Sequence, residues 1–198
     1  QKNIKVSNVA GYSTNSVAQH TFATLLSITN NIEYYKTYVA QKKYSKQSMF
    51  THLNGPIPEL SSMTLGIIGM GRIGQAVARR ARGFDMEINY HNRHRIDENI
   101  ESDLGTTYWE NLDEMLAQMD LVSINCPQTP ETYHLLNADR LNLLQSHAVI
   151  VNTARGGIMD EAALADRLAS GAIAGAGLDV YENEPKIHPK LCELNNVI

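Results

Sequence analysis

A charged side chain able to bind a small acid follows one of the apolar runs in this chain of 198 residues. Arg155 comes shortly after residues 148–152 (AVIVN). Its planar guanidinium has the geometry to bind a carboxylate or a keto oxygen through two parallel hydrogen bonds. An ion pair with nearby Asp160 or Glu161 is the structural alternative. If Arg155 lies in a cleft, the pattern favours a substrate that carries a carboxylate.

Three acids lie at the end of another apolar run, residues 175–179 (GAGLD). They are Asp179, Glu182 and Glu184. An acid in a cleft could orient a histidine and raise its pKa, and a solvated acidic loop is the alternative. The spacing of the seven histidines shows no catalytic triad. We expect His20 to be packed or capping and His188 to lie at the surface.

The two cysteines, Cys126 and Cys192, lack the spacing of metal ligands, and we expect no metal site. Cys126 follows a strand-like run, where a cysteine is more often a packing residue than a nucleophile, and no base is placed beside it by sequence. Such sparse cysteines favour a reducing, cytoplasmic setting over a disulfide framework.

Residues 64–74 (TLGIIGMGRIG) contain the spacing G-x-G-x-x-G directly after an apolar run. Gly69 would permit a tight turn, Gly71 would let backbone approach a pyrophosphate, and Gly74 would let a helix pack on the strand. The helical run at residues 75–83 would then point its positive N-terminus at the phosphates. The context on both sides predicts dinucleotide binding.

The second strand of this unit ends in Asn92-Arg93-His94-Arg95. NAD enzymes usually place an acid about 20 residues after the glycines, to hold the ribose 2′-hydroxyl. Asn92 stands there instead, 18 residues after Gly74. Arg93 and Arg95 could pair with a 2′-phosphate, although a solvated basic turn is the alternative. NADP(H) is therefore favoured as the cofactor, and NAD(H) stays possible.

Strand-like and helical runs alternate from residue 64 onward, which predicts an α/β fold with a doubly wound parallel sheet. Ligands bind such sheets at the carboxyl ends of the strands. We expect strands at residues 65–68, 88–90, 121–125, 148–152 and 175–179, and helices at residues 75–83, 112–119, 138–144 and 161–168.

The first part of the chain predicts a short extended segment at residues 4–8 and one long helix at residues 16–39. The aromatic, basic segment 34–54 has two interpretations, a loop packed on the same domain or an arm that reaches across a dimer. Tyrosines are frequent at interfaces.

Composition excludes several classes of function. The net charge is −4, without a basic stripe for nucleic acid. No apolar run approaches the roughly 18 residues that a membrane helix needs. We therefore expect neither a nucleic-acid nor a membrane partner.

Four motifs in this order resemble the nucleotide-binding domain of the D-isomer-specific 2-hydroxyacid dehydrogenases: GMGRIG, INCPQTPETYHLLN, VNTARGGIMDE and AGLDVYENEP. The resemblance implies reduction of a small 2-oxo acid to a D-2-hydroxy acid. Arg155 matches the family's catalytic arginine, and Glu184, 29 residues later, matches its glutamate in preference to Glu182. The other matches are Arg72 and Ile73 at the pyrophosphate, Thr153, Ala154 and Asp179 around the nicotinamide, and Cys126, Pro127 and Thr132 along the ribose.

Within this family the signals for a branch are mixed. Residues 8–60 resemble glycerate dehydrogenases, and residues from 64 onward resemble glyoxylate/hydroxypyruvate reductases that use NADPH. Two positions are unusual, Asn89 within a buried strand and Asp85 where relatives often carry glycine.

The family's catalytic histidine belongs to a motif beyond Ile198, and its substrate domain is built from both chain ends. We therefore expect residues 1–12 to be a crossover segment from that domain, and residues 13–198 to be the dinucleotide-binding domain. Its residues from about 13 to 60 would form a dimerisation helix and arm, giving a homodimer. The chain alone would bind cofactor without turnover. A non-catalytic NAD(H)-sensing scaffold, like co-repressors of this fold, is the alternative.

Overall fold

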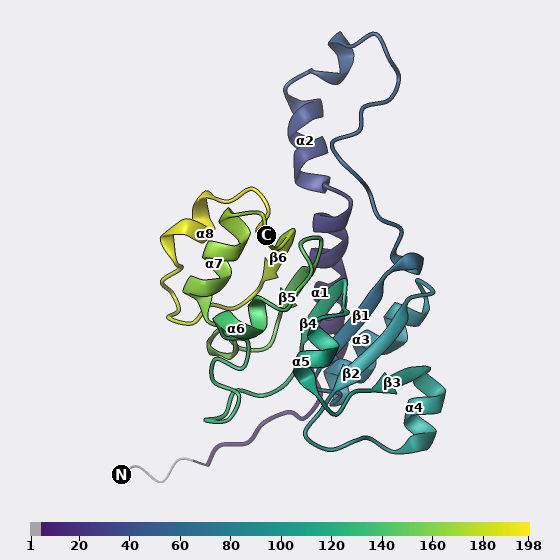
Figure 1. Ribbon diagram of the computed structural model, residues 1–198, viewed down its shortest axis with the longest axis vertical. Coiled ribbons are helices and arrows are strands. Elements are labelled where there is room, and N and C mark those ends of the chain that lie inside the picture. The colour runs from purple at the N-terminus through teal and green to yellow at the C-terminus, as the bar shows by residue number, and fades with distance from the viewer. Residues whose placement is uncertain (1–4) are drawn as a thin grey trace.

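A single parallel sheet of six strands forms the centre of the computed structural model, which describes residues 5–198 (Figure 1). The strand order is β3-β2-β1-β4-β5-β6, which confirms the predicted doubly wound α/β fold. Residue 4 of the expected extended segment lies outside the described residues, and residues 5–9 have no regular structure. The strands are β1 (Thr64–Ile68), β2 (Glu87–His91), β3 (Thr106–Tyr108), β4 (Leu121–Ile124), β5 (Val149–Asn152) and β6 (Gly175–Leu178).

Helices cover both faces of this sheet, so the central strands are buried on both sides and are almost entirely apolar. One apolar cluster joins the sheet to α1, α3 and α4, and the other joins it to α5, α6, α7 and α8. The helices are α1 (Thr14–Thr29), α2 (Ile32–Ala40), α3 (Arg72–Arg82), α4 (Glu98–Leu104), α5 (Leu112–Leu116), α6 (Ala138–Leu141), α7 (Glu161–Ala169) and α8 (Pro189–Glu193), with 3-10 turns at Tyr44–Lys46, Leu60–Ser62 and Gly156–Ile158.

Helix α1 precedes the sheet in sequence but packs on its last strand (Figure 1). A Cβ atom on Gly177 would lie 2.2 Å from Thr24 Cγ2, and one on Gly175 would lie 2.8 Å from Ile28 Cγ2. The small residues of β6 therefore bring the helix close to the strand backbone. This contact, together with the packing of α1 on α3 and β5, fixes α1 against one face of the sheet.

The expected single helix over residues 16–39 is wrong, because α1 ends at Thr29 and α2 begins at Ile32. The Asn30 side chain donates to the Leu26 carbonyl (3.1 Å), and Asn31 adopts a left-handed conformation with φ of 52°. Asparagine competes locally for backbone hydrogen bonds and tolerates this conformation, so the pair ends the helix.

The segment from α2 onward projects away from the sheet (Figure 1). No side chain of α2 is buried. The segment packs on itself instead: the rings of Tyr38 and His52 stack with centroids 4.2 Å apart, and the Tyr34 hydroxyl lies 2.8 Å from His52 Nε2. Large apolar side chains such as Phe50 and Leu53 stay exposed. The interpretation of a loop packed on the same domain is therefore wrong.

Three short elements were not expected from the sequence: α4, β3 and α8. Helix α4 has no apolar stripe and is started by Asp97, whose carboxylate accepts from Asn99 N–H (2.9 Å). Two expected helices are shorter than predicted, since α5 ends at Leu116 and α6 at Leu141. Met119 and Leu144, which the expected helices included, are buried outside regular helix, whereas Leu143 is exposed.

The two unusual positions have structural explanations. Asn89 is buried in β2, where its side-chain oxygen accepts a hydrogen bond from the Trp109 indole N–H (2.8 Å). A buried polar group with a good partner carries little penalty. Asp85 has a φ of 56°, the left-handed conformation that glycine adopts without strain.

We predict that Gly177→Ala destabilises the domain by about 1–3 kcal/mol, the usual cost of forcing an extra methyl group into a packed core. Urea unfolding followed by circular dichroism measures the change. Adding Thr24→Ser removes the Cγ2 atom nearest the new methyl group and should restore part of the loss. Equal stability of the unmodified chain and the single variant would contradict the close contact.

Candidate functional site

The turn between β1 and α3 is built by three glycines in three different ways. Gly69 has a φ of +98°, and a Cβ there would lie 2.5 Å from the Cys126 backbone nitrogen. A Cβ on Gly74 would lie 2.2 Å from the Gly69 carbonyl oxygen, whereas one on Gly71 would meet nothing within 4 Å. The space before the first N–H groups of α3 is therefore open, which fits a pyrophosphate. Arg72 and Ile73 are the first two residues of that helix.

The loop after β4 runs beside this turn. Asn125 N–H donates to the Ile68 carbonyl (2.8 Å), which keeps the loop against the end of β1. Thr132 closes the loop, because its hydroxyl donates to the Pro127 carbonyl (2.7 Å) and accepts from Thr129 N–H (2.7 Å). Cys126 is mostly buried, and burial raises the pKa of its thiol to about 11. The structure therefore gives this thiol no nucleophilic character at neutral pH.

Arg93 and Arg95, which follow β2 and were both expected to bind a 2′-phosphate, have different surroundings in the structure. Arg95 is held by Glu101, with Nη2 2.7 Å from the carboxylate, so it is not free to bind a phosphate. Arg93 is exposed and has no ion pair within residues 5–198. The Asn92 amide donates to the His94 carbonyl (2.9 Å), which shapes the turn.

The residues after β5 are positioned by the buried side chain of Asn152. Its amide donates to the Arg155 carbonyl (3.0 Å), and its oxygen accepts from Ala154 N–H (3.0 Å). The hydroxyl of Thr153 lies 3.2 Å from that of Thr21 on α1. These contacts present Arg155 at the surface of the sheet edge.

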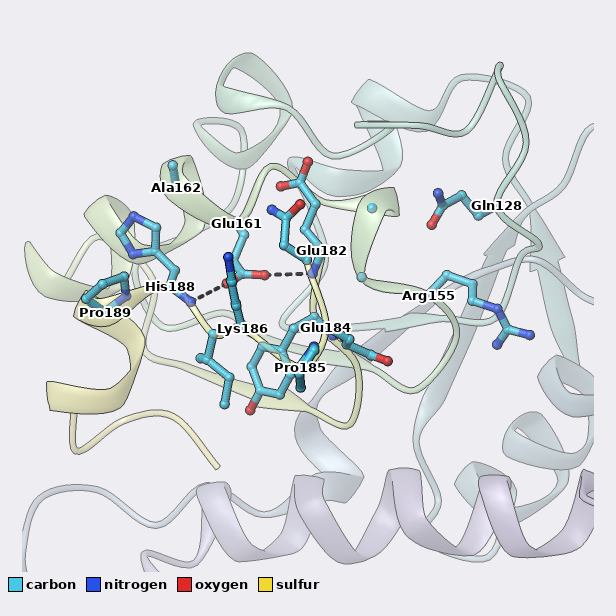
Figure 2. A pocket seen from close by; sticks show the side chains of 15 residues that line it. Gln128, Arg155, Glu161, Ala162, Glu182, Glu184, Pro185, Lys186, His188 and Pro189 are labelled. Carbon is cyan, nitrogen blue, oxygen red and sulfur yellow. Dashed lines mark hydrogen bonds between the residues drawn. The ribbon is translucent and has the colours of Figure 1, made fainter.

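The expected alternative for Arg155, an ion pair with Asp160 or Glu161, does not occur in the described part of the chain. Asp160 instead caps α7 by accepting from Ala163 N–H (3.0 Å). Glu161 accepts from the backbone N–H groups of Glu182 and His188, as Figure 2 shows. The Arg155 side chain points away from Glu161 (Figure 2), and it remains available to a ligand.

The loop after β6 gives its three acids different surroundings. Asp179 is exposed and lies 3.4 Å from His20 Nε2 on α1. Glu184 is exposed, and its carboxylate accepts from Tyr181 N–H (3.0 Å). The Glu182 side chain is only 19% exposed and is bound by Tyr133 and His134. Glu184 is therefore the freer of the two glutamates.

A cavity of about 1180 Å³ lies between the loop after β6 and the start of α7. Arg155 and Glu184 both line it, so the structure brings the two predicted catalytic residues to one cavity (Figure 2). The cavity also takes in Gln128, from the loop after β4. Asn92 and Arg93 lie elsewhere, at the end of β2. A dinucleotide spans such a distance along the carboxyl edge of the sheet.

Sequence reasoning missed the residues that position this edge. In the sequence, Asn152 is only the end of an apolar run, and Gly156 is only one of two adjacent glycines. A Cβ on Gly156 would lie 1.9 Å from the Tyr181 carbonyl carbon, so the two loops touch through backbone. The only signal in the sequence was a polar residue, Asn152, at the end of an otherwise apolar run.

Six parallel strands in this order, with an open glycine turn at the switch point, define a dinucleotide-binding domain of the Rossmann type. The model of the family "D-isomer specific 2-hydroxyacid dehydrogenase, NAD binding domain" matches residues 22–198. The chain belongs to this family, and the resemblance stated from its motifs is confirmed.

Relatives with curated names and solved structures agree with this assignment. The chain is 40% identical over 199 residues to a glyoxylate reductase of Pyrococcus furiosus, covering all of this chain and 59% of that protein. An NADPH-dependent glyoxylate/hydroxypyruvate reductase of Sinorhizobium meliloti, solved with NADP and malonate, is 35% identical, with a TM-score of 0.87 over 98% of this chain and 58% of that one.

A D-lactate dehydrogenase of Aquifex aeolicus, solved with NAD and lactic acid, is 33% identical, with a TM-score of 0.84 over all of this chain and 62% of that one. The chain thus spans about three fifths of the length of these relatives. Among residues 5–198, no helix is long and apolar enough to cross a membrane, and no cluster of side chains could hold a metal ion.

We predict that Cys126 reacts slowly with iodoacetamide. At pH 8 a thiol of pKa about 11 is roughly 0.1% thiolate, against about a quarter for an ordinary thiol of pKa 8.5. Mass spectrometry of the Cys192→Ser variant isolates Cys126, whose labelling rate should rise about tenfold per pH unit between pH 8 and 10. A rate at pH 8 equal to that of free cysteine would show that the thiol is not shielded.

Proposed function

We propose that this chain is the cofactor domain of an oxidoreductase that reduces glyoxylate or hydroxypyruvate to a D-2-hydroxy acid. The observation that supports it most directly is the open space at Gly71, in front of the N-terminus of α3, on the same sheet edge as Arg155 and Glu184. The names of the relatives, glyoxylate reductases in particular, support the substrate class.

Different residues along the carboxyl edge of the sheet would contact different parts of the cofactor. Gly71, Arg72 and Ile73 would hold the pyrophosphate, and Thr153, Ala154 and Asp179 would surround the nicotinamide, which supplies the hydride when bound. The loop containing Cys126, Pro127 and Thr132 would line the ribose.

Arg155 would bind the substrate carboxylate and polarise its keto group, which stabilises the charge that develops on the oxygen. Glu184 would keep a histidine protonated, so that this histidine can donate a proton to that oxygen. By the family resemblance, the histidine comes from sequence beyond Ile198. Reduction would therefore need a proton donor in addition to Arg155 and Glu184.

Two measurements test this function. Calorimetric titration of the 198-residue chain with NADPH should give saturable binding, and glyoxylate should not be turned over by the chain alone. Positioned acid–base catalysis is worth roughly 10²–10⁴ in rate, and substrate positioning more. The full-length protein should reduce glyoxylate, and its Arg155→Leu variant should lose at least about 10²-fold in kcat/KM.

A control separates loss of the site from loss of the fold. Arg167→Leu removes an arginine of α7 that lies outside the cavity, and it should leave kcat/KM unchanged. NADPH binding by a full-length protein without any turnover would favour the non-catalytic sensing scaffold instead. Absence of binding of both NADPH and NADH would refute both functions.

The cofactor's 2′ position would be read by Arg93, because Arg95 is held by Glu101. Asn92 offers no carboxylate to repel a phosphate, and it can still bond to a ribose hydroxyl. We therefore propose NADPH as the preferred cofactor and NADH as a weaker one. The NADP complex of the Sinorhizobium relative supports this preference.

We predict that Arg93→Ala removes most of the preference for NADPH and leaves NADH affinity nearly unchanged. A charge-assisted hydrogen bond contributes roughly 1.5–3 kcal/mol, or about ten- to a hundredfold in affinity, and exposure and salt reduce it. Titration of both cofactors at low and high salt measures it. The matched control is Arg95→Ala, which should leave the preference intact. Equal affinity of the unmodified chain for both cofactors at low salt would contradict the proposal.

The projecting segment supports a homodimer built through this domain. α2 and the residues after it expose Val39, Tyr44, Phe50 and Leu53 on an extension that does not pack on its own sheet. Exposed apolar surface of this kind marks interaction sites. Residues 1–12 would lead into the substrate domain.

We predict a dimer in sedimentation equilibrium at micromolar concentration. Phe50→Asp combined with Leu53→Asp should shift the chain towards monomer, because charges oppose burial of this surface. The circular dichroism spectrum should not change, since neither side chain contacts the sheet. A monomer before any substitution would show that the extension is not an interface.

A further inference from the structure

Glu182, in the loop after β6, is bound by two side chains from the loop after β4. Its carboxylate oxygen Oε1 accepts from the Tyr133 hydroxyl (2.7 Å) and lies 2.9 Å from His134 Nε2. The rings of Tyr133 and His134 stack on each other with centroids 4.1 Å apart. Two adjacent residues therefore hold one carboxylate from the neighbouring loop.

The backbone of Glu182 is fixed from the other side. Its N–H donates to Glu161 Oε2 (2.8 Å), and the other oxygen of Glu161 accepts from His188 N–H (2.6 Å), as the dashed lines in Figure 2 show. Gly156 packs directly on the peptide that joins Tyr181 to Glu182. Side chain and backbone of Glu182 thus join the loops that follow β4, β5 and β6.

The contacts of Glu182 with Tyr133, His134 and Glu161 form a junction between loops, and this junction also includes the loop after β5. His134 N–H donates to the Gly157 carbonyl (2.8 Å), and Leu136 N–H donates to the Ile158 carbonyl (3.0 Å). His134 adopts a left-handed conformation with φ of 47°, which is unfavourable for a residue with a side chain. This conformation directs the backbone N–H to one loop and the imidazole to another.

Arg155 and Glu184 lie on the two sides of this junction. Arg155 directly precedes Gly156, and Glu184 follows Glu182 by two residues while accepting from Tyr181 N–H. The relative position of the two residues therefore depends on how firmly the loops are joined at Glu182. A misplacement of about 1 Å at such a site costs up to 10² in rate.

We propose that Glu182, held by Tyr133 and His134, is a positioning residue that fixes Glu184 relative to Arg155. This inference rests on the proposed function, in which Arg155 binds the substrate and Glu184 raises the pKa of a histidine. Glu182 touches none of the glycines at the phosphate turn, so its effect should fall on catalysis and not on cofactor affinity.

The charge state of the junction agrees with this role. Burial and the nearby Asp160 oppose ionisation of Glu182, yet the hydrogen bonds from Tyr133 and His134 outweigh them and lower its pKa. Glu161 and Glu184 are the further acids of this cavity, and its other titratable groups are Arg155, Tyr181, Lys186 and His188. Glu182 therefore stays ionised, and the two donors stay bound, at neutral pH.

The test measures glyoxylate reduction by the full-length protein across pH, together with NADPH binding. Glu182→Ala should lower kcat by about ten- to a hundredfold, and NADPH affinity should not change. Because Glu184 would no longer support the histidine, the basic limb of the kcat/KM profile should move to lower pH. Glu182→Gln keeps an oxygen acceptor for Tyr133, so it should recover part of both effects. A purely structural role would not move the basic limb.

Two further variants keep the result interpretable. Tyr133→Phe removes one donor without changing shape and should give a smaller change in the same direction, even if Glu182→Ala folds poorly. Glu193→Ala, an exposed glutamate of α8 outside the cavity, is the matched control and should have no effect. An unchanged kcat and basic limb in both Glu182→Ala and Tyr133→Phe would overturn the proposal. An unmodified protein that fails to reduce glyoxylate would instead refute the proposed function.

Discussion

The contact between backbone atoms at Gly69 is the constraint on which the cofactor edge of the sheet depends. Here the end of β1, the first turn of α3 and the start of the loop after β4 meet with no side chain between them. A methyl group on Gly69 or Gly74 would collide with peptide atoms that cannot rotate away. The direction of α3, and with it the position of its free N–H groups, follows from this packing.

Short polar side chains shape the remaining loops of this edge. Asn152 and Thr132 each bond to the backbone of their own loop, so the loops after β5 and β4 have their conformation fixed locally. Contacts between loops then set their relative positions, through Glu161 and Glu182 in particular. The groups proposed to meet ligands, Arg155 and Arg93, are exposed ends on this rigid frame. That division is typical of sites in which a scaffold positions a few exposed side chains.

Most of the sheet could be predicted from the sequence, because each central strand is a short apolar run bounded by turn residues. The strand that the sequence failed to show is the three-residue edge strand β3, none of whose residues is buried. The break between α1 and α2 was hidden for a different reason. The apolar residues on both sides keep a helical spacing, and only the left-handed Asn31 interrupts it.

The sequence predicts the parts of the candidate site in which residue type alone determines the chemistry. It does not predict the parts in which the chemistry depends on the partners that a side chain meets in the fold. Arg93 and Arg95 are equivalent in sequence, and only the position of Glu101 on the unpredicted helix α4 distinguishes them. The family resemblance distinguishes Glu184 from Glu182, but the partners of Glu182 are seen only once the loop after β4 is placed in space. Contacts between residues far apart in sequence carry this information, and local patterns do not contain it.

The packing of α1 on β6 also affects how the domain is made. Thr24 and Gly177 touch in the finished fold but are separated by most of the chain. During synthesis, α1 emerges before β5 and β6, so the part of its apolar face that packs on these strands stays uncovered until they have left the ribosome, while α3 can cover the rest earlier. Contacts of such long sequence separation form late and slow the folding of a domain. We therefore expect the docking of residues 14–29 on β6 to be among the last steps in the folding of this domain.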